Sequence, residues 1–212
     1  MLFSQLVIAN LQTKFLGREI EYYQRLGSTN VEAFELIDKG GIADGTMVIT
    51  DHQFEGKGRQ RRSWFASPGK AVTFSVILRP EISTQQNGLL SLAAGVAVAE
   101  AVAKFGLTPA LKWPNDIRIS GKKCGGALVE TKVKRDSVEY AVVGIGLNVN
   151  ESLNELPEEL RNTATTLSAE KGSPLQRELV VAWILNALER WIDAVKSGKS
   201  ASLRSTWLEK CD

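Results

Sequence analysis

Residues 112–150 read KWPNDIRISGKKCGGALVETKVKRDSVEYAVVGIGLNVN, and this stretch decides the fold class of the chain. Turn-forming residues interrupt it at 120–121 and 134–136, around apolar segments at 127–129 and 140–149. Short apolar runs bounded by turn residues are typical of interior β-strands. We therefore predict a run of strands joined by tight turns, in a sheet that is mixed or largely antiparallel.

Helices are predicted on both sides of this stretch in the sequence. Residues 87–105 carry Leu, Ala and Val at helical spacing with little charge, which predicts a helix packed under the sheet. A second helix is expected over 175–195, with Ser173 and Pro174 as its cap and first-turn residue. A shorter helix is expected over 201–211.

An amphipathic helix is predicted over residues 29–39. Thr29 and Glu32 have the spacing of a capping box, and Gly40 and Gly41 would end the helix. The side chains expected to face the core are Val31, Phe34, Leu36 and Ile37.

The composition is that of one main domain. The 212 residues are 43% hydrophobic and 24% charged, and a net charge of +2 is too small to suggest a general nucleic-acid binder. Cys124 and Cys211 are expected to be thiols, each a small buried residue. The single histidine, His52, leaves no His/Cys cluster for zinc. Residues 1–11 resemble neither a signal peptide nor a membrane span, so we expect a cytoplasmic protein.

The basic loop, residues 56–64, reads GKGRQRRSW and lies between strands predicted at 46–51 and 71–78. Its glycines let the backbone approach a ligand, its cations can donate to oxyanions, and Trp64 offers a flat face to a base. These are the parts needed to hold a nucleotide. A solvated basic surface loop is the alternative.

Two motifs place polar groups where they could contact a ligand. Residues 27–30, GSTN, place hydroxyls and an amide at a helix N-terminus, where they could bind a polar ligand or simply cap the helix. Residues 112–116, KWPND, place an amide beside a carboxylate. This pair could hold a magnesium-bound phosphate, with Asp116 as the carboxylate, or form an Asx turn between strands.

Two further motifs place glycines in strands. Residues 121–130, GKKCGGALVE, set a cation before two glycines, so that Lys123 could neutralise a carboxylate or an α-phosphate. A hairpin turn with incidental lysines is the alternative. Residues 144–150, GIGLNVN, alternate glycine in an apolar strand, which indicates that something approaches it closely. A Rossmann fingerprint is excluded because the third glycine and the following helix are missing.

Taken in order, these motifs resemble those of biotin protein ligases, the enzymes that attach biotin to a lysine of a carboxylase carrier domain. The resemblance covers residues 27–150 and is carried by four motifs: Gly-Arg-Gly-Arg-x-x-Arg-x-Trp at 56–64 with Lys57 for the first arginine, Lys-Trp-Pro-Asn-Asp at 112–116, Lys-x-x-Gly-x-Leu-x-Glu at 123–130, and Gly-x-Gly-x-Asn at 144–148. Four ordered motifs are far more specific than any one of them.

The resemblance implies an α/β (α+β) sandwich similar to class II aminoacyl-tRNA synthetase catalytic domains. It also implies two reactions: biotin and ATP give biotinyl-5′-AMP and pyrophosphate, and a lysine of the biotin carboxyl carrier protein of acetyl-CoA carboxylase then displaces AMP. The substrates would be biotin and ATP, with Mg held through the phosphates. No protein nucleophile is needed, in agreement with the lone histidine.

The resemblance also assigns residues to roles. Those implied for biotin are Ser28, Thr29, Asn30, Gln53, Gly56, Arg59, Lys123, Gly125 and Gly126. Those implied for the nucleotide are Arg59, Arg62, Trp64, Asn115, Lys123 and Asn148. The catalytic set would be Lys123, Arg59 and Asp116, with Asp116 as a possible metal ligand. The basic loop would close over the intermediate and be partly disordered without ligand.

The chain departs from the family pattern at its ends. Family members continue into a small β-barrel after the last helix, whereas this sequence stops at Asp212, so we expect residues 1–212 to be the catalytic domain alone. No room precedes Gly27 for the DNA-binding domain of repressor-type ligases, so we expect no operator binding.

Other readings of the sequence stay open. A homodimer is possible if the strand at 144–150 is an edge rather than an interior strand. The alternative functions are a lipoate or octanoate ligase, whose Arg-Arg-x-x-Gly-Gly-Gly motif is missing here, and a non-catalytic biotin- or nucleotide-binding module.

Overall fold

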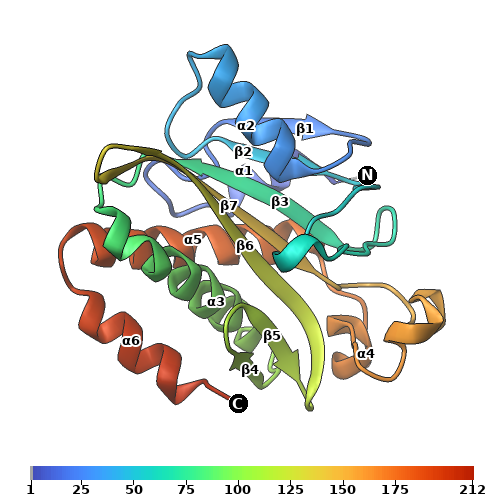
Figure 1. Cartoon of the computed structure of the whole chain (residues 1–212). Coiled ribbons are helices and arrows are strands. Elements are labelled where there is room, and N and C mark those ends of the chain that lie inside the picture. The colour runs from blue at the N-terminus through green and yellow to red at the C-terminus, as the bar shows by residue number, and fades with distance from the viewer. Residues whose placement is uncertain (1) are drawn as a thin grey trace.

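A single mixed sheet forms the centre of the molecule in the computed structural model, which describes residues 2–212 (Figure 1). Its order is β1-β2-β3-β7-β6-β5-β4. The strands are β1 (Ile20–Tyr23), β2 (Met47–Thr50), β3 (Val72–Leu78), β4 (Pro109–Lys112), β5 (Asp116–Ile119), β6 (Lys122–Lys134) and β7 (Ser137–Leu147). The β1–β2 pair is parallel and the other five pairs are antiparallel, which confirms the predicted sheet.

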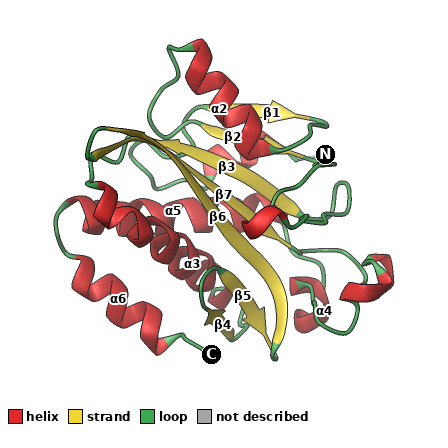
Figure 2. Ribbon diagram, in the orientation of Figure 1, coloured by secondary structure: helices red, strands yellow, loops and turns green. Residues whose placement is uncertain are grey.

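Helices cover both faces of the sheet (Figure 2). They are α1 (Ser4–Ala9), α2 (Thr29–Lys39), α3 (Asn87–Ala103), α4 (Leu167–Lys171), α5 (Arg177–Lys196) and α6 (Ser200–Glu209), with short 3₁₀ helices at 59–61, 84–86, 153–155 and 158–160. The helices α3 and α5 pack against each other on one face, while α2 lies on the other face over β2, β3 and β7.

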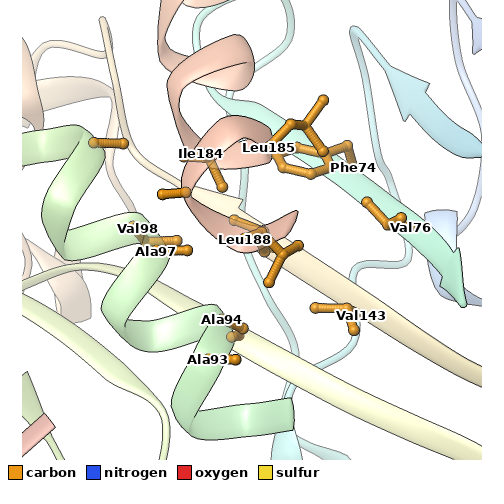
Figure 3. Close-up of a cluster of buried hydrophobic side chains, with 14 of the residues drawn as sticks. Phe74, Val76, Ala93, Ala94, Ala97, Val98, Val143, Ile184, Leu185 and Leu188 are labelled. Carbon is orange, nitrogen blue, oxygen red and sulfur yellow. The ribbon is translucent and has the colours of Figure 1, made fainter. Parts of the chain in front are cut away.

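The main core lies between the sheet and the α3–α5 layer. Figure 3 shows Phe74, Val76 and Val143 of the sheet facing small residues of α3 and the leucines of α5. Because side chains alternate along a strand, Ser75 and Ile77 point to the opposite face, where a smaller core packs beneath α2. That opposite face carries the polar groups described below.

The segment Thr84–Ala103 is long and apolar enough to span a membrane by length and composition alone, but 61% of its apolar 18-residue window is buried inside the protein. Its small side chains allow α3 to lie close to the sheet and to α5. It therefore has the position of a core helix, as its spacing predicts.

The predicted capping box at the start of α2 is wrong. The N-cap residue is Ser28, and its side chain makes no capping hydrogen bond. The Glu32 carboxylate instead accepts a hydrogen bond of 2.9 Å from the Tyr23 hydroxyl, and the Thr29 hydroxyl lies 2.7 Å from that of Ser75. The helix buries Ala33 and Ile37, whereas Val31, Phe34 and Leu36 are half-buried. The hydroxyls at the start of α2 are therefore not used as caps.

The start of α5 also differs from the prediction. The helix begins at Arg177 rather than at Leu175, and its N-cap residue is Gln176 rather than Ser173. Asn150 explains the delay because its side chain accepts from the Leu175 N–H at 2.9 Å and donates to the Leu175 carbonyl at 2.8 Å. Both backbone groups of Leu175 are thereby held outside the helix.

The strand β7 is interior, so the alternative of an edge at 144–150 is wrong. It pairs with β3 on one side and with β6 on the other. Both cysteines are free thiols, as predicted, but only Cys124 is buried and Cys211 is exposed. The sequence reading also missed α1, β1 and α4, which are short.

Candidate functional site

A cavity of about 510 Å³ opens where α2, the basic loop, β5, β6 and β7 meet, and it draws on all four motifs. Its polar and aromatic lining is Ser28, Thr29, Asn30, Gln53, Lys57, Arg59, Gln60, Arg62, Ser63, Trp64, Lys112, Trp113, Asn115, Asp116 and Lys123. Gly126, Gly144 and Gly146 contribute backbone to it. Segments far apart in the sequence are thus brought together in one concave site.

The basic loop folds back on itself as a narrow hairpin. The Trp64 N–H donates to the Gly56 carbonyl at 2.8 Å, and the Gly58 N–H donates to the Arg62 carbonyl at 2.7 Å. A Cβ atom at Gly56 would lie 2.4 Å from the Trp64 carbonyl oxygen, so glycine is required there. Arg59 and Arg62 are exposed at the cavity, where their guanidinium groups can reach an anion.

The two glycines of the Gly-x-Gly motif form the floor of the cavity. A Cβ atom at Gly144 would lie 2.1 Å from Asn30 Oδ1, and one at Gly146 would lie 2.5 Å from the Trp64 ring. Residues two apart on a strand face the same side, so both side chains lie directly on the β7 backbone. This close approach explains why glycine alternates in the strand.

Lys123 stands at the centre of the site. Its Nζ lies 2.6 Å from Asp116 Oδ1 and 5.8 Å from the centroid of the Trp64 ring. Both partners of this ion pair are partly exposed, with 38% of the lysine side chain and 29% of the aspartate side chain accessible. The ammonium group can therefore reach a ligand while Asp116 and the ring hold it in place.

A second, smaller pocket of about 330 Å³ adjoins the cavity and shares Ser63, Trp64, Lys112, Asp116, Lys123 and Leu160 with it. Asn148 lines this pocket and is only 5% exposed. Its Nδ2 donates to the Thr165 carbonyl at 3.1 Å, while its Oδ1 is buried without a hydrogen-bond partner. A fixed, unmatched acceptor thus lies in the same pocket as the Trp64 ring.

Some residues of the implied set lie outside both pockets. Gly56 lines a larger outer hollow between the basic loop and residues 127–130. Gly125 faces away from the site, because a Cβ atom there would lie 2.6 Å from Leu147 Cδ1.

Asn115 lines the cavity, but its Nδ2 donates to the Ala127 carbonyl at 2.8 Å and so fastens the 112–116 turn to β6.

The sequence reading missed Ser75 and Glu130 as parts of the site. Ser75 is fully buried, with its Oγ 2.7 Å from Thr29 Oγ1 and 2.6 Å from Asn30 Oδ1. Glu130 ends the Lys-x-x-Gly-x-Leu-x-Glu motif and accepts a 2.7 Å hydrogen bond from Asn30 Nδ2. The available signal for Ser75 was a hydroxyl between Phe74 and Val76 in an apolar strand.

Glu151 is a buried acid beside the site that the sequence did not single out. Burial raises the pKa of Glu151 to about 7, although its carboxylate accepts the Val149 N–H at 2.7 Å. Its other oxygen, Oε1, is buried without a hydrogen-bond partner. The group fixes the chain just after Asn148.

No group of three or more His, Cys, Asp or Glu side chains that could hold a metal ion occurs within residues 2–212. Among the described residues lining the cavity, Asp116 is the one carboxylate. Magnesium is commonly bound by one or two carboxylates together with substrate phosphates. This donor set fits an ion that arrives with a nucleotide rather than a resident metal centre.

Comparison with known proteins places these features in one family. The model of the biotin/lipoate A/B protein ligase family matches residues 22–148. The chain is 39% identical over 181 residues to the bifunctional ligase/repressor BirA of Bacillus subtilis (strain 168), covering 85% of this chain and 55% of the relative. It is 34% identical over 177 residues to the biotin--[acetyl-CoA-carboxylase] ligase of Mycobacterium tuberculosis, covering 81% of this chain and 63% of the relative.

The fold agrees with a solved structure. A biotin protein ligase from Aquifex aeolicus in complex with biotin and ATP superposes with a TM-score of 0.77 at 27% identity, over 92% of this chain and 78% of that chain. This similarity confirms the predicted fold class. The chain spans little more than half the length of the first curated relatives, at 55% for the Bacillus protein.

Proposed function

Because the chain belongs to the biotin/lipoate A/B protein ligase family, we propose that it activates biotin with ATP and transfers it to a carrier lysine. The activated product is biotinyl-5′-AMP, and the acceptor is the biotin carboxyl carrier protein of an acetyl-CoA carboxylase. The names of the relatives and the biotin and ATP bound to the Aquifex protein support biotin over lipoate.

The observation that carries the proposal is that the two pockets meet at Lys123. The larger cavity has hydroxyls and amides for a small polar ring, and the smaller pocket has an aromatic face and an amide for a base. A biotin in the first and an adenine in the second would bring the biotin carboxylate and the α-phosphate together at the ammonium group.

Three cations then stabilise the transition state of the first step, namely Lys123, Arg59 and Arg62. A carboxylate oxygen of biotin attacks the α-phosphorus, the bond to the β-phosphate oxygen breaks, and pyrophosphate leaves with the electron pair. Fixed cations that face the developing negative charge lower the barrier without a protein nucleophile. A magnesium ion carried by the phosphates would neutralise further charge, with Asp116 as its protein ligand.

In the second step the neutral ε-amine of the carrier lysine attacks the carbonyl carbon of the anhydride, the bond from that carbon to the phosphate oxygen breaks, and AMP leaves. The nitrogen gives up one proton as the amide forms, and Asp116, a carboxylate that lines the cavity, is the group we assign to accept it. The basic loop covers the anhydride and excludes water, which would otherwise hydrolyse it. Loss of order in this loop without ligand remains a prediction.

We assign ATP as the nucleotide because the Aquifex relative binds ATP and the Trp64 ring lines the smaller pocket, where it can stack on a base. Asn148 lines the same pocket, with its Nδ2 engaged by the Thr165 carbonyl and its Oδ1 buried.

Biotin-dependent exchange of labelled pyrophosphate into ATP tests the proposal directly. Exchange with biotin and none with lipoate is the expected result. Exchange with lipoate alone would identify a lipoate ligase, and biotin binding without exchange would identify a binding module. Thermal shifts with each acid report binding independently of turnover.

The remaining assignments are also proposals. Residues 1–212 would act as a catalytic domain in the cytoplasm. Transfer to a purified carrier domain by this chain tests the first part. Sedimentation with and without biotin tests for a homodimer.

A further inference from the structure

A relay of four polar side chains runs from the exposed face of β6 to the cavity. The relay consists of Glu130, Asn30, Ser75 and Thr29. Asn30 Nδ2 donates to Glu130 Oε2 at 2.7 Å, Ser75 Oγ lies 2.6 Å from Asn30 Oδ1, and Thr29 Oγ1 lies 2.7 Å from Ser75 Oγ. Asn30, Ser75 and Thr29 are at most 4% exposed, so water does not compete with these contacts.

Glu130 determines which group donates and which accepts in the hydrogen bonds of the relay. A carboxylate can only accept, so the Asn30 amide must turn its NH₂ group toward Glu130. The Leu128 carbonyl, 3.4 Å from the same nitrogen, favours the same orientation. The opposite end of the amide, Oδ1, is thereby fixed as an acceptor that faces Ser75.

The orientation of the Asn30 amide also fixes the hydrogen bonds of Ser75, because a hydroxyl has one proton to donate. Asn30 Oδ1 cannot donate, so the 2.6 Å contact takes the Ser75 proton. The 2.7 Å contact between the hydroxyls of Ser75 and Thr29 must then use the proton of Thr29. Ser75 does not line the cavity, so it acts on a ligand only through Thr29.

Thr29 is left with lone pairs alone to offer the cavity that it lines. Gln53 Oε1 accepts the Thr29 backbone N–H at 2.8 Å and is a second, more distant acceptor for the Thr29 hydroxyl at 3.2 Å, so either contact uses the Thr29 proton. The Thr29 hydroxyl is therefore an obligatory acceptor, and the ligand group opposite it must carry a proton.

We propose that Glu130 and Ser75 are positioning residues that fix the Thr29 hydroxyl as an acceptor, so that the site selects a ring with an N–H donor. The proposal rests on the proposed function, in which the ligand is biotin with its two ureido N–H groups. A dithiolane ring, or a ring with oxygen at that position, meets a lone pair where it needs a donor or a neutral surface.

Calorimetric binding of biotin and of its two cyclic carbamate analogues, each with one ureido N–H replaced by oxygen, tests the relay. Wild type should bind the analogue altered opposite Thr29 on the order of 100-fold more weakly than biotin. In Ser75→Ala the Thr29 hydroxyl loses its nearer partner and keeps only the 3.2 Å contact to Gln53 Oε1, so it can turn and donate to the ring oxygen, and this ratio should fall to roughly 10-fold. A merely structural role would weaken both ligands equally and leave the ratio unchanged.

Glu130 gives a matched pair of variants at an exposed position. Glu130→Gln keeps an acceptor for Asn30 and should keep the wild-type ratio. Glu130→Lys presents a donor, favours the flipped Asn30 amide and should lower the ratio as Ser75→Ala does. This pair decides the question even if Ser75→Ala does not fold, which thermal unfolding would reveal.

The outcomes separate the two proposals. If wild type binds lipoate and not biotin, the proposed function fails. If wild type binds both analogues as tightly as it binds biotin, the relay is overturned and the biotin assignment stands. The same conclusion follows if Ser75→Ala and Glu130→Lys keep the wild-type ratio.

Discussion

At the scale of single residues, Lys123 carries the clearest functional prediction. Lys123→Ala should lower biotin-dependent pyrophosphate exchange by a factor on the order of 100 to 1,000, because it removes a fixed charge from the developing phosphate charge. Lys122→Ala is the matched control, since Lys122 lines neither pocket. Equal rates for the two variants would remove Lys123 from the chemistry.

Gly146 tests the floor of the cavity. Gly146→Ala places a methyl group 2.5 Å from the Trp64 ring, so the ring must move and ATP should bind at least about 10-fold more weakly than to wild type. Gly88→Ala is the control, because nothing lies within 4 Å of a Cβ atom there. Calorimetry with ATP should separate the two; unchanged affinity in Gly146→Ala would mean that Trp64 does not stack on the base.

Glu151 predicts a pH dependence of stability. Burial raises its pKa to about 7 from 4.5, so the folded state favours the protonated acid. The free energy of unfolding therefore keeps the whole contribution of Glu151 below pH 4.5. It falls by at most about 3 kcal/mol as the pH rises from 4.5 through 7. Glu151→Gln should unfold with the same free energy as wild type at pH 4 and be more stable at pH 8. Denaturant titrations at both pH values measure this, and parallel curves for the two proteins would contradict it.

At the scale of elements, the basic loop is expected to retain the adenylate. Arg59→Ala should increase leakage of biotinyl-5′-AMP into solution more than it weakens biotin binding, because the cavity loses a cation above the phosphate. Arg61→Ala is the matched control, as Arg61 lines the outer hollow but not the cavity. Quantifying free adenylate after rapid filtration distinguishes them, and equal leakage would mark Arg59 as an ordinary surface charge.

Strands were predictable from the sequence because turn residues mark their ends, as Ser120 and Arg135 do with positive φ values of 50° and 54°. Helix starts were less so, since Asn150, 25 residues away, holds Leu175 out of α5. The motifs located the cavity, but a hydroxyl such as Ser75 gains its role only from partners on other elements. Contacts of this kind have no local signature.

At the scale of the whole molecule, a buried ion pair joins α5 to the end of β2. Arg177 donates to Asp51 at 3.0 Å and to the Ala71 carbonyl at 3.1 Å. Arg177→Ala should lower the free energy of unfolding by roughly 1.5 to 3 kcal/mol, because the buried Asp51 carboxylate loses a charge-assisted hydrogen bond while it keeps those from the Tyr22 hydroxyl and the Leu2 N–H. Arg190→Ala, which breaks an exposed pair with Glu100, should cost less than about 1 kcal/mol. Urea titration compares the two, and similar losses would show that the Arg177 pair contributes little.

The position of β7 has a consequence for altering what the protein accepts. The strand carries Gly144 and Gly146 and is paired with β3 on one side and β6 on the other. The backbone at these glycines is therefore held in place by hydrogen bonds to both neighbouring strands, although glycine is the most flexible residue type. The floor of the cavity cannot move to make room for a bulkier acid, so the side walls of the cavity would have to be enlarged instead. Engineering efforts would therefore do best to vary the surrounding walls, and to leave this central platform untouched.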